Sequence, residues 1–379
     1  MKIVADENIT GLRHLFAPHA ELLMLPGRAI TEEVLHDADV LLVRSVTRVG
    51  ASLLAHSPVK FVGTATSGTD HIDQDYLCDA GIAFADAAGC NANSVVEYVI
   101  AALSHLSLSK NFSWLEKTLG IVGAGHIGGL LAARLEKLNM DYVIHDPLLD
   151  PAGRHAARLV SFEQASAQDI LTLHTPLTYD TEFPTFHMLD AGVINNLCGG
   201  QVVINAARGG VIDGNALKAR LRKKNDLLTV IDAWENEPEP DPGLLKLVTI
   251  GTPHIAGYSY DGKLKGSLLL YEKFCRHFGL EYRDPGFYGV EDLVLDLHDE
   301  VGLHGEELMD RAIRGAYDIG ADHASLSAIG ANRASGVAGG LFEGLRKNYR
   351  KRYEFYHFRP ILPAHEKNLA QLLRNLGFQ

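Results

Sequence analysis

The sequence contains few cysteines, and no two of them lie close together. The four cysteines are Cys78, Cys90, Cys198 and Cys275, and they form no C-x-x-C pair. A disulfide framework or a zinc site needs cysteines at paired, regular spacings, so neither is indicated. Scattered thiols are typical of a reducing compartment, and we therefore expect a cytoplasmic protein.

Long apolar segments and an excess of positive charge are also absent. No apolar run is long enough to span a bilayer, and the first residues, MKIVADENIT, lack the apolar core of a signal peptide. The 47 acidic residues outnumber the 35 basic ones, which leaves a net charge of −12. This charge argues against a nucleic-acid partner and against a membrane surface. An anionic substrate would therefore need arginines of its own.

Short apolar runs rich in β-branched residues recur along the first 250 residues. Such continuous runs are typical of strands buried on both faces of a parallel sheet. They occupy residues 2–5, 40–43, 60–63, 120–122, 142–144, 170–173, 202–204, 228–231 and 247–250. The last six alternate with helical patterns and predict a doubly wound α/β sheet, preceded by a smaller α/β unit.

The arrangement of the 379 residues predicts more than one domain. A helix is expected over 91–110, where Ser94 and Glu97 have capping-box spacing, and another over 259–279. At this second helix the chain is expected to return to the first unit, which makes that domain discontinuous. The last ninety residues differ in character: they carry a basic run, Arg346 to Arg352, and end in a helix stopped at Gly377. Most of that run is interpreted as a solvated helix face.

A glycine-rich loop follows the strand expected at 120–122. Gly123 permits a tight turn, Gly125 lets a pyrophosphate approach, and Gly128 lets the following helix pack closely on the strand. The backbone N–H groups of His126 and Ile127 would face the phosphates at the positive end of that helix. A lone G-x-G-x-x-G is a weak signal, because glycines also serve ordinary turns. The flanking strand and helix make a dinucleotide site the stronger interpretation.

An acidic residue stands where a ribose-binding carboxylate is expected. Asp146 follows the next strand, eighteen residues beyond Gly128, close to the interval at which such a carboxylate bonds the adenosine ribose. It favours NAD over NADP, since it would repel a 2′-phosphate. Arg154 or Arg158 would weaken this argument if either folded back onto the site.

Three functional groups follow successive strands of the doubly wound sheet. Arg208, Glu237 and His254 come after the runs that end at residues 204, 231 and 250. Ligands of open α/β sheets bind beyond the carboxyl ends of the strands, so the three side chains can converge. Arginine can grip a carboxylate bidentately, histidine can exchange a proton near neutrality, and a carboxylate can stabilise imidazolium. The set predicts an oxidoreductase that oxidises a hydroxy acid.

These motifs resemble those of the D-isomer-specific 2-hydroxyacid dehydrogenases. The similarity rests on the glycine loop, N-A-A-R-G at 205–209, E-N-E-P at 235–238 and T-P-H-I-A-G at 252–257. It implies that Arg208 binds substrate, Glu237 assists and His254 is the acid/base. It also implies that NAD is the cofactor, held by the glycine loop, Asp146, Thr175, Ala206, Ala207, Arg208, Asp232 and Gly257. No metal is implied.

The same resemblance implies a fold for each region. Residues 94–256 would be a Rossmann-type NAD-binding domain. Residues 1–93 and 257–285 would be a discontinuous, flavodoxin-like α/β substrate (lid) domain. Residues 286–379 would be an α+β dimerisation domain, so that the protein is a homodimer.

Further stretches resemble one branch of that family whose substrate carries a phosphate. They are KIVADENI at the start, L-V-R-S-V-T at 42–47, G-T-A-T-S-G-T-D-H-I-D at 63–73, H-I-A-G-Y-S at 254–259, and the long C-terminal extension. On that resemblance Ser45, Thr66 and Tyr258 touch the substrate. A phosphate also needs cationic donors. We expect Arg44 to meet it, with Arg346 as a second candidate, from this chain or from the partner subunit.

Two other functions are compatible with the same motifs. One is a phosphoglycerate or glyoxylate/hydroxypyruvate dehydrogenase of the same family. The other is an NAD-sensing binding protein that keeps the fold for partner recognition. The complete set of Arg208, Glu237 and His254 disfavours the second.

Overall fold

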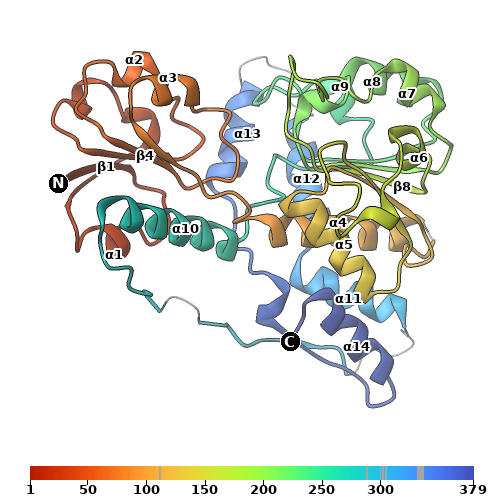
Figure 1. Cartoon of the computed structure of the whole chain (residues 1–379). Coiled ribbons are helices and arrows are strands. Elements are labelled where there is room, and N and C mark those ends of the chain that lie inside the picture. Colours follow the sequence, from red (N-terminus) through yellow and green to blue (C-terminus); the bar gives the residue numbers. More distant parts are fainter. Residues whose placement is uncertain (111, 287–288, 299, 301–302, 304, 331–336) are drawn as a thin grey trace. The chain divides into compact units, whose positions relative to one another are not determined.

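A computed structural model of the chain describes residues 1–110, 112–286, 289–298, 300, 303, 305–330 and 337–379 (Figure 1). The chain divides into two compact units. Unit 1 comprises Met1–Ala92 and Tyr258–Gly289, and unit 2 comprises Asn93–Gly257 and Val290–Gln379. Within the described ranges, no helix has both the length and the apolar character needed to cross a membrane. The two units are α/β, as the sequence predicts.

Unit 2 is built on a six-stranded parallel sheet with the order β11-β10-β9-β8-β6-β7. Its strands are β6 (Leu119–Val122), β7 (Tyr142–His145), β8 (Ile170–Leu173), β9 (Val202–Asn205), β10 (Leu228–Ile231) and β11 (Ile250–Gly251). The order reverses direction after β7, and this produces the switch point at which ligands of such sheets bind.

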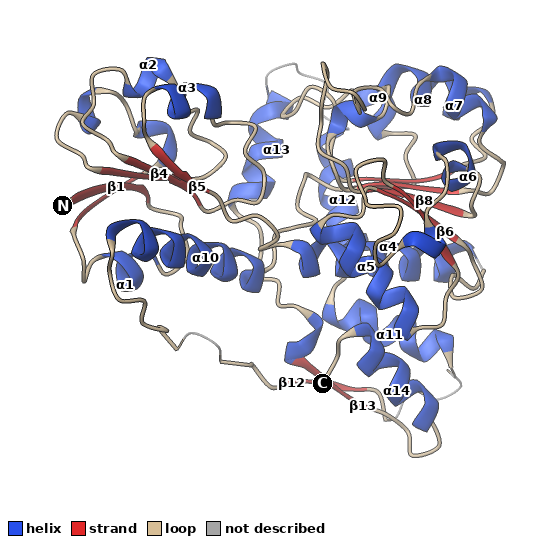
Figure 2. Ribbon diagram, in the orientation of Figure 1, coloured by secondary structure: helices blue, strands red, loops and turns tan. Residues whose placement is uncertain are grey.

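Helices cover both faces of this sheet (Figure 2). One face is covered by α4 (Ala92–Lys110) and α5 (His126–Lys137). The other face is covered by the short α6 (Phe162–Ser166), α7 (Ala191–Asn196), α8 (Gly214–Lys223) and α9 (Pro242–Leu245). Residues 170–173 and 202–205 are entirely buried, as expected of strands covered on both sides. The continuous apolar runs therefore predicted this sheet well.

The C-terminal residues pack onto the same unit. They form β12 (Leu293–Asp296), α11 (Glu306–Ala316), α12 (Ile319–Gly330), α13 (Val337–Lys347), β13 (Phe358–Ile361) and α14 (Lys367–Leu376). The helix α12 packs against β11 and α9, and α14 packs against α5. Leu326 and Phe342 are buried in the same apolar core as the residues of the large sheet. The strands β12 and β13 form a separate two-stranded parallel sheet.

Unit 1 contains a five-stranded parallel sheet with the order β2-β1-β3-β4-β5. The strands are β1 (Lys2–Asp6), β2 (Glu21–Leu25), β3 (Val40–Val43), β4 (Phe61–Thr64) and β5 (Ala83–Ala85). Two apolar cores lie on its faces. The first includes α1 (Leu12–Phe16) and α10 (Tyr260–Phe278), and the short helices α2 (Ala51–Leu54) and α3 (Gln74–Asp79) contribute to the second.

The remaining regular elements are short 3-10 helices. They cover Gly27–Ala29, Glu33–Leu35, Ala156–Arg158, Gly209–Val211 and Phe355–His357.

Three expectations at the level of single elements were wrong. The helix α4 begins at Ala92, so Ser94 lies inside it and is no N-cap; Ser94 and Glu97 instead bond Glu354 and the Phe355 N–H. The strand expected at 247–250 starts only at Ile250. The basic run is no continuous solvated face, because α13 ends at Lys347 and Arg352 is only 4% exposed.

Candidate active site

The glycine loop adopts the geometry that its spacing predicts. Gly123 has a φ of +86°, a conformation that glycine adopts without strain. A Cβ on Gly128 would lie 2.0 Å from the carbonyl oxygen of Gly123, so only glycine fits where helix α5 passes the strand. A Cβ on Gly125 would meet nothing within 4 Å. The loop is therefore tight on the protein side and open at the helix N-terminus.

Two neighbouring groups complete a cradle for a dinucleotide. Asp146 follows β7 and accepts a hydrogen bond from the Ala124 N–H at 2.8 Å, which holds its carboxylate beside the loop. The hydroxyl of Thr175 is buried and has no hydrogen-bond partner among the described residues. An unpaired buried hydroxyl costs free energy unless a ligand satisfies it. The donor at Thr175, the open side of Gly125 and the carboxylate of Asp146 fit NAD.

Arg208 lies in a loop that Asn205 shapes. The Asn205 side chain accepts from the Ala207 N–H at 3.1 Å and donates to the Arg208 carbonyl at 3.0 Å. Ala206 and Ala207 are buried, while Arg208 is half-buried. The next residue must be glycine: a Cβ on Gly209 would fall 2.0 Å from the backbone of Trp234. The loop after β9 is thus pressed against the loop after β10.

A second brace holds the far end of the Arg208 loop. The backbone N–H of His187 donates to the Gly210 carbonyl at 2.7 Å, and its ring Nε2 lies 2.6 Å from one carboxylate oxygen of Glu235. The other Glu235 oxygen accepts from the Gly214 N–H. His187, Glu235 and Asp213 bring three potential metal-ligand atoms within 4.8 Å of one another. Each of the three already serves in hydrogen bonds or, for Asp213, in capping α8, and these bonds account for the cluster.

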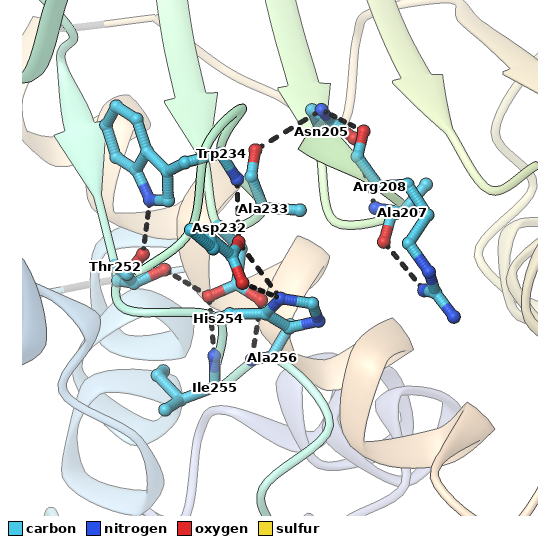
Figure 3. Close-up of polar contacts among 11 residues, drawn as sticks. Asn205, Ala207, Arg208, Asp232, Ala233, Trp234, Thr252, His254, Ile255 and Ala256 are labelled. Atoms are coloured by element: carbon cyan, nitrogen blue, oxygen red, sulfur yellow. Dashed lines mark hydrogen bonds and ion pairs between the residues drawn. The ribbon is translucent and has the colours of Figure 1, made fainter. Parts of the chain in front are cut away.

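Asp232 organises the turn that carries His254 (Figure 3). Its carboxylate is buried and accepts from the Thr252 hydroxyl at 2.6 Å, the Ile255 N–H at 2.8 Å and the Ala256 N–H at 2.9 Å. Burial raises the pKa of Asp232, and His254 and these three donors oppose that shift. His254 itself has a φ of +55°, an uncommon backbone conformation for a non-glycine residue. The turn keeps it because its backbone is bonded on several sides.

His254 and Glu237 form a close pair at the centre of the site. The His254 Nδ1 lies 2.8 Å and 3.0 Å from the two carboxylate oxygens of Glu237. Burial alone would raise the pKa of Glu237, but His254, the Trp234 N–H and Arg346 together lower it. Glu237 is therefore ionised near neutrality, and its carboxylate accepts a hydrogen bond from the Nδ1–H of His254. The opposite ring nitrogen of His254 is left to exchange a proton with a ligand.

Arg346 belongs to the same neighbourhood, on helix α13 of the same chain. Its charge contributes to the lowered pKa of Glu237. The helix approaches the Glu237 loop closely, because a Cβ on Gly339 would lie 3.0 Å from the Glu239 side chain. Gly339 and Arg346 are seven residues apart, so they share one face of α13.

The predicted substrate residues Arg44, Ser45, Thr66 and Tyr258 belong to unit 1. Arg44 and Ser45 follow β3, and Thr66 follows β4, its neighbour in the parallel sheet. All three therefore lie at the carboxyl edge of that sheet. The Thr66 hydroxyl donates to the Gly68 carbonyl at 2.8 Å. Tyr258 precedes α10, and the Lys263 ammonium lies 4.8 Å from its ring centroid.

Several residues that shape the site were not predicted as functional. The indole N–H of Trp234 donates to the Thr252 carbonyl at 2.8 Å, and the backbone N–H of Trp234 donates to the Glu237 carboxylate at 2.8 Å. The Tyr98 hydroxyl lies 2.7 Å from the Thr252 hydroxyl. Thr252 stands directly before Pro253 in the recognised motif and could have been noticed. Tyr98 is separated from it by 154 positions, and no local pattern reveals the contact.

Comparison with known proteins agrees with this geometry. Residues 107–256 match the family model of the D-isomer specific 2-hydroxyacid dehydrogenase, NAD binding domain. Proteins named erythronate-4-phosphate dehydrogenase from Cellvibrio japonicus and Hahella chejuensis are 43% and 42% identical over the whole of this chain, and the matches cover 100% and 99% of their lengths. This chain belongs to the erythronate-4-phosphate dehydrogenase branch of the D-isomer specific 2-hydroxyacid dehydrogenase family. Unit 2 accordingly contains its NAD-binding domain.

Solved structures share the fold over about three quarters of the chain. The NAD+-bound 3-phosphoglycerate dehydrogenase of Entamoeba histolytica has a TM-score of 0.62 at 24% identity and covers 74% of this chain and 95% of its own. The NAD-dependent formate dehydrogenase of Staphylococcus aureus, solved with NAD, has a TM-score of 0.59 at 23% identity and covers 75% and 98%. The remaining quarter of this chain is matched by the erythronate-4-phosphate dehydrogenases and not by these two folds.

Proposed function

We propose that this protein is an NAD-dependent dehydrogenase that oxidises 4-phospho-D-erythronate to 2-oxo-3-hydroxy-4-phosphobutanoate, a step of pyridoxal 5′-phosphate biosynthesis. The observation that carries the proposal is the His254–Glu237 pair at 2.8 Å, beside the Arg208 loop at the carboxyl ends of β9 to β11. The names of the full-length relatives supply the substrate.

Each catalytic side chain has one task in the proposed reaction. Arg208 grips the substrate carboxylate and polarises the oxygen on C2. His254 takes the proton of the C2 hydroxyl, and Glu237 stabilises the imidazolium that forms. In the reverse direction His254 returns that proton to the C2 carbonyl oxygen. Bound NAD supplies the acceptor of the hydride that leaves C2.

The cofactor would be held by groups at the ends of the unit 2 strands. The N–H groups of His126 and Ile127 open helix α5 and suit the pyrophosphate. Asp146 suits the adenosine ribose, and its negative charge favours NAD over NADP. Thr175, Ala206, Ala207, Asp232 and Gly257 are proposed to line the rest of the site.

The phosphate of the substrate needs cationic donors, and two arginines are proposed for it. Arg44 follows β3 at the carboxyl edge of the unit 1 sheet, beside Ser45. Arg346 lies close to Glu237 within the same chain, so a partner subunit is not needed to supply it. Ser45, Thr66 and Tyr258 are proposed to hydrogen-bond the substrate.

A homodimer and a cytoplasmic location are part of the proposal. The two-stranded sheet of β12 and β13 exposes Val294 and Ile361, which are 47% and 37% accessible. Helix α11 packs against β12, but Val294 and Ile361 stay exposed, and a two-stranded sheet gains stability when another surface covers it. A second copy of the C-terminal region is the proposed cover for these side chains.

Steady-state kinetics with competing acids tests the substrate. We expect kcat/KM for 4-phospho-D-erythronate to exceed that for D-erythronate and 3-phosphoglycerate by about 10–100-fold or more, because a site built for particular polar groups rejects ligands that lack them. A preference for 3-phosphoglycerate, or for an unphosphorylated acid, would contradict the proposal. NAD binding without turnover of any of these acids would favour a sensing protein.

A further inference from the structure

One arginine of the C-terminal segment contacts both places where the chain passes between the two units. The chain leaves unit 1 after Ala92 and re-enters it at Tyr258. Arg352 donates from one nitrogen, Nη2, to the Ser94 carbonyl at 3.1 Å and to the Ala256 carbonyl at 2.7 Å. Each acceptor lies two residues or fewer from a boundary of unit 2. The two acceptors, Ser94 and Ala256, are 162 residues apart in sequence (256 − 94), and a single guanidinium joins them.

The neighbours of Arg352 bind the first crossing as well. Glu354 accepts from the Asn93 amide at 2.7 Å and from the Ser94 hydroxyl at 3.0 Å. The Phe355 N–H donates to Glu97 at 2.9 Å. The start of α4 is thus bonded to Arg352, Glu354 and Phe355, which belong to one short C-terminal segment. Two of the α4 side chains involved, Ser94 and Glu97, have a spacing that predicts an ordinary helix cap.

The second crossing continues directly into the catalytic turn. Ala256 donates its N–H to Asp232 (Figure 3). Its carbonyl accepts from Arg352, so both of its polar backbone groups are fixed. His254 lies two residues earlier, with its N–H bonded to the Asp232 carbonyl at 2.9 Å. Asp232 holds the turn from the strand side, and Arg352 holds it from the C-terminal side.

Burial disfavours the charge of Arg352, but Tyr317, Tyr349, Glu97 and Glu354 outweigh that effect and raise its pKa. The side chain is 4% exposed, and its Nε and Nη1 have no hydrogen-bond partner among the described residues. The Tyr317 ring lies 4.3 Å from its guanidinium carbon and supplies a cation–π contact. Removing one member of a buried charge cluster is destabilising, so Arg352 contributes to stability as a countercharge. Its bonds to two distant carbonyls go beyond that role, because a countercharge need not join the two crossings.

We infer that Arg352 is a positioning residue. It ties together the two segments of unit 2 that lie at the chain crossings, and it thereby holds the turn that carries His254. The inference rests on the proposed function in one respect, the role of His254. It gives the C-terminal extension a task within its own subunit, apart from dimerisation.

Two variants and a matched control test this assignment. Arg352→Met keeps an unbranched, flexible side chain and removes both hydrogen bonds, and Arg352→Lys keeps the charge with a single donor atom. Leu373→Ala is the control, because Leu373 is buried in α14 and its apolar side chain makes no hydrogen bond to either crossing. We expect Arg352→Met to lower kcat per folded active site about tenfold, with a smaller change in NADH affinity, because the glycine loop is untouched and only the Asp232–Gly257 end of the cofactor site is affected. The lysine variant should recover part of the loss.

Hydrogen exchange separates positioning from general destabilisation. In both Arg352 variants, amides of residues 92–97 and 252–258 should exchange faster than in Leu373→Ala at a matched decrease in melting temperature. The measurement needs no substrate, so it still tests the role of Arg352 if the proposed reaction is wrong. If the methionine variant does not fold, the exchange of Arg352→Lys is compared with that of Leu373→Ala. Unchanged exchange in both segments, or a loss of kcat no greater than that of Leu373→Ala, would overturn the inference.

Discussion

Each unit buries an aspartate at the end of a central strand, and the two are used differently. In unit 1, Asp6 ends β1, and its Oδ1 accepts from the backbone and side chain of Asn8, two residues on. In unit 2, Asp232 follows β10 and accepts from Thr252, Ile255 and Ala256 beyond the next strand. The first aspartate shapes its own loop, whereas the second joins two strand ends.

The difference indicates how the work of the protein is divided. Unit 2 places ionisable groups at adjoining strand ends and holds them with bonds between strands, as proton transfer at a fixed position requires. Unit 1 offers Ser45 and Thr66 hydroxyls and the half-buried Arg44 at its sheet edge, which suits recognition. Changes in unit 2 should therefore alter kcat, and changes in unit 1 should alter KM.

The largest effect is expected at His254. Replacing it by glutamine removes the proton acceptor and should lower kcat by about 10²–10⁴-fold. Stopped-flow measurement of NADH formation gives the rate, and NADH titration provides the folding control, since the glycine loop is unchanged. A variant that keeps more than about a tenth of the wild-type kcat would remove His254 from the mechanism.

A smaller loss of kcat is expected for Glu237→Gln, about 10–100-fold, because a charge-assisted hydrogen bond to the imidazolium is replaced by a neutral one. The folded-state pKa of Glu237 is lowered. Its stabilisation is therefore present above its usual pKa of 4.5 and is lost as the pH falls through the lower folded value. As the pH falls through that acidic range, the melting temperature of the wild type should decrease more steeply than that of the variant. Parallel curves would show that the pair does not stabilise the fold.

The two aspartates can be compared directly. Asp232→Asn turns an amide N–H₂ toward backbone donors and should lower the unfolding free energy by about 1–3 kcal/mol, with kcat reduced about tenfold. Asp6→Asn keeps an acceptor for Asn8 and should change kcat by less than about threefold. Thermal melts and initial rates measure both. Equal effects on kcat would end the contrast between the units.

The smallest effect, confined to KM, is expected at Arg44. Arg44→Ala should raise KM for 4-phospho-D-erythronate about tenfold and leave KM for D-erythronate unchanged, because one charged hydrogen bond is lost. Arg48→Ala, an exposed arginine of the same loop region, is the matched control and should behave as wild type. An unchanged KM in Arg44→Ala would exclude this arginine as a phosphate ligand.

Local sequence patterns predicted most strands, and they failed where long-range contacts decide. The buried runs that became β3 and β8 are continuous and β-branched, and they kept their predicted bounds. The strand β2 was missed, since E-L-L-M-L has helix-forming residues and only its pairing with β1 makes it extended. The three-residue β5 was also missed, because it is too short to show a period.

The site shows the same division. The motif residues Arg208, Glu237 and His254 could be identified because each comes within a few residues of the end of a predicted strand. The supports of the site could not, because Tyr98 and Arg352 reach it from 154 and 96 positions away. Arg352 also stands in a basic run, and such runs are usually solvated.

The most direct test of the central claim follows the hydrogen on C2 of the substrate. With 4-phospho-D-erythronate deuterated at C2, we predict that mass spectrometry finds the deuterium in NADH, with none released to water, and that His254→Gln slows this transfer without changing where the label goes. Release of deuterium to solvent would mean that C2 loses a proton instead of a hydride. That result would contradict the assignment of Arg208, Glu237 and His254 to a dehydrogenase reaction.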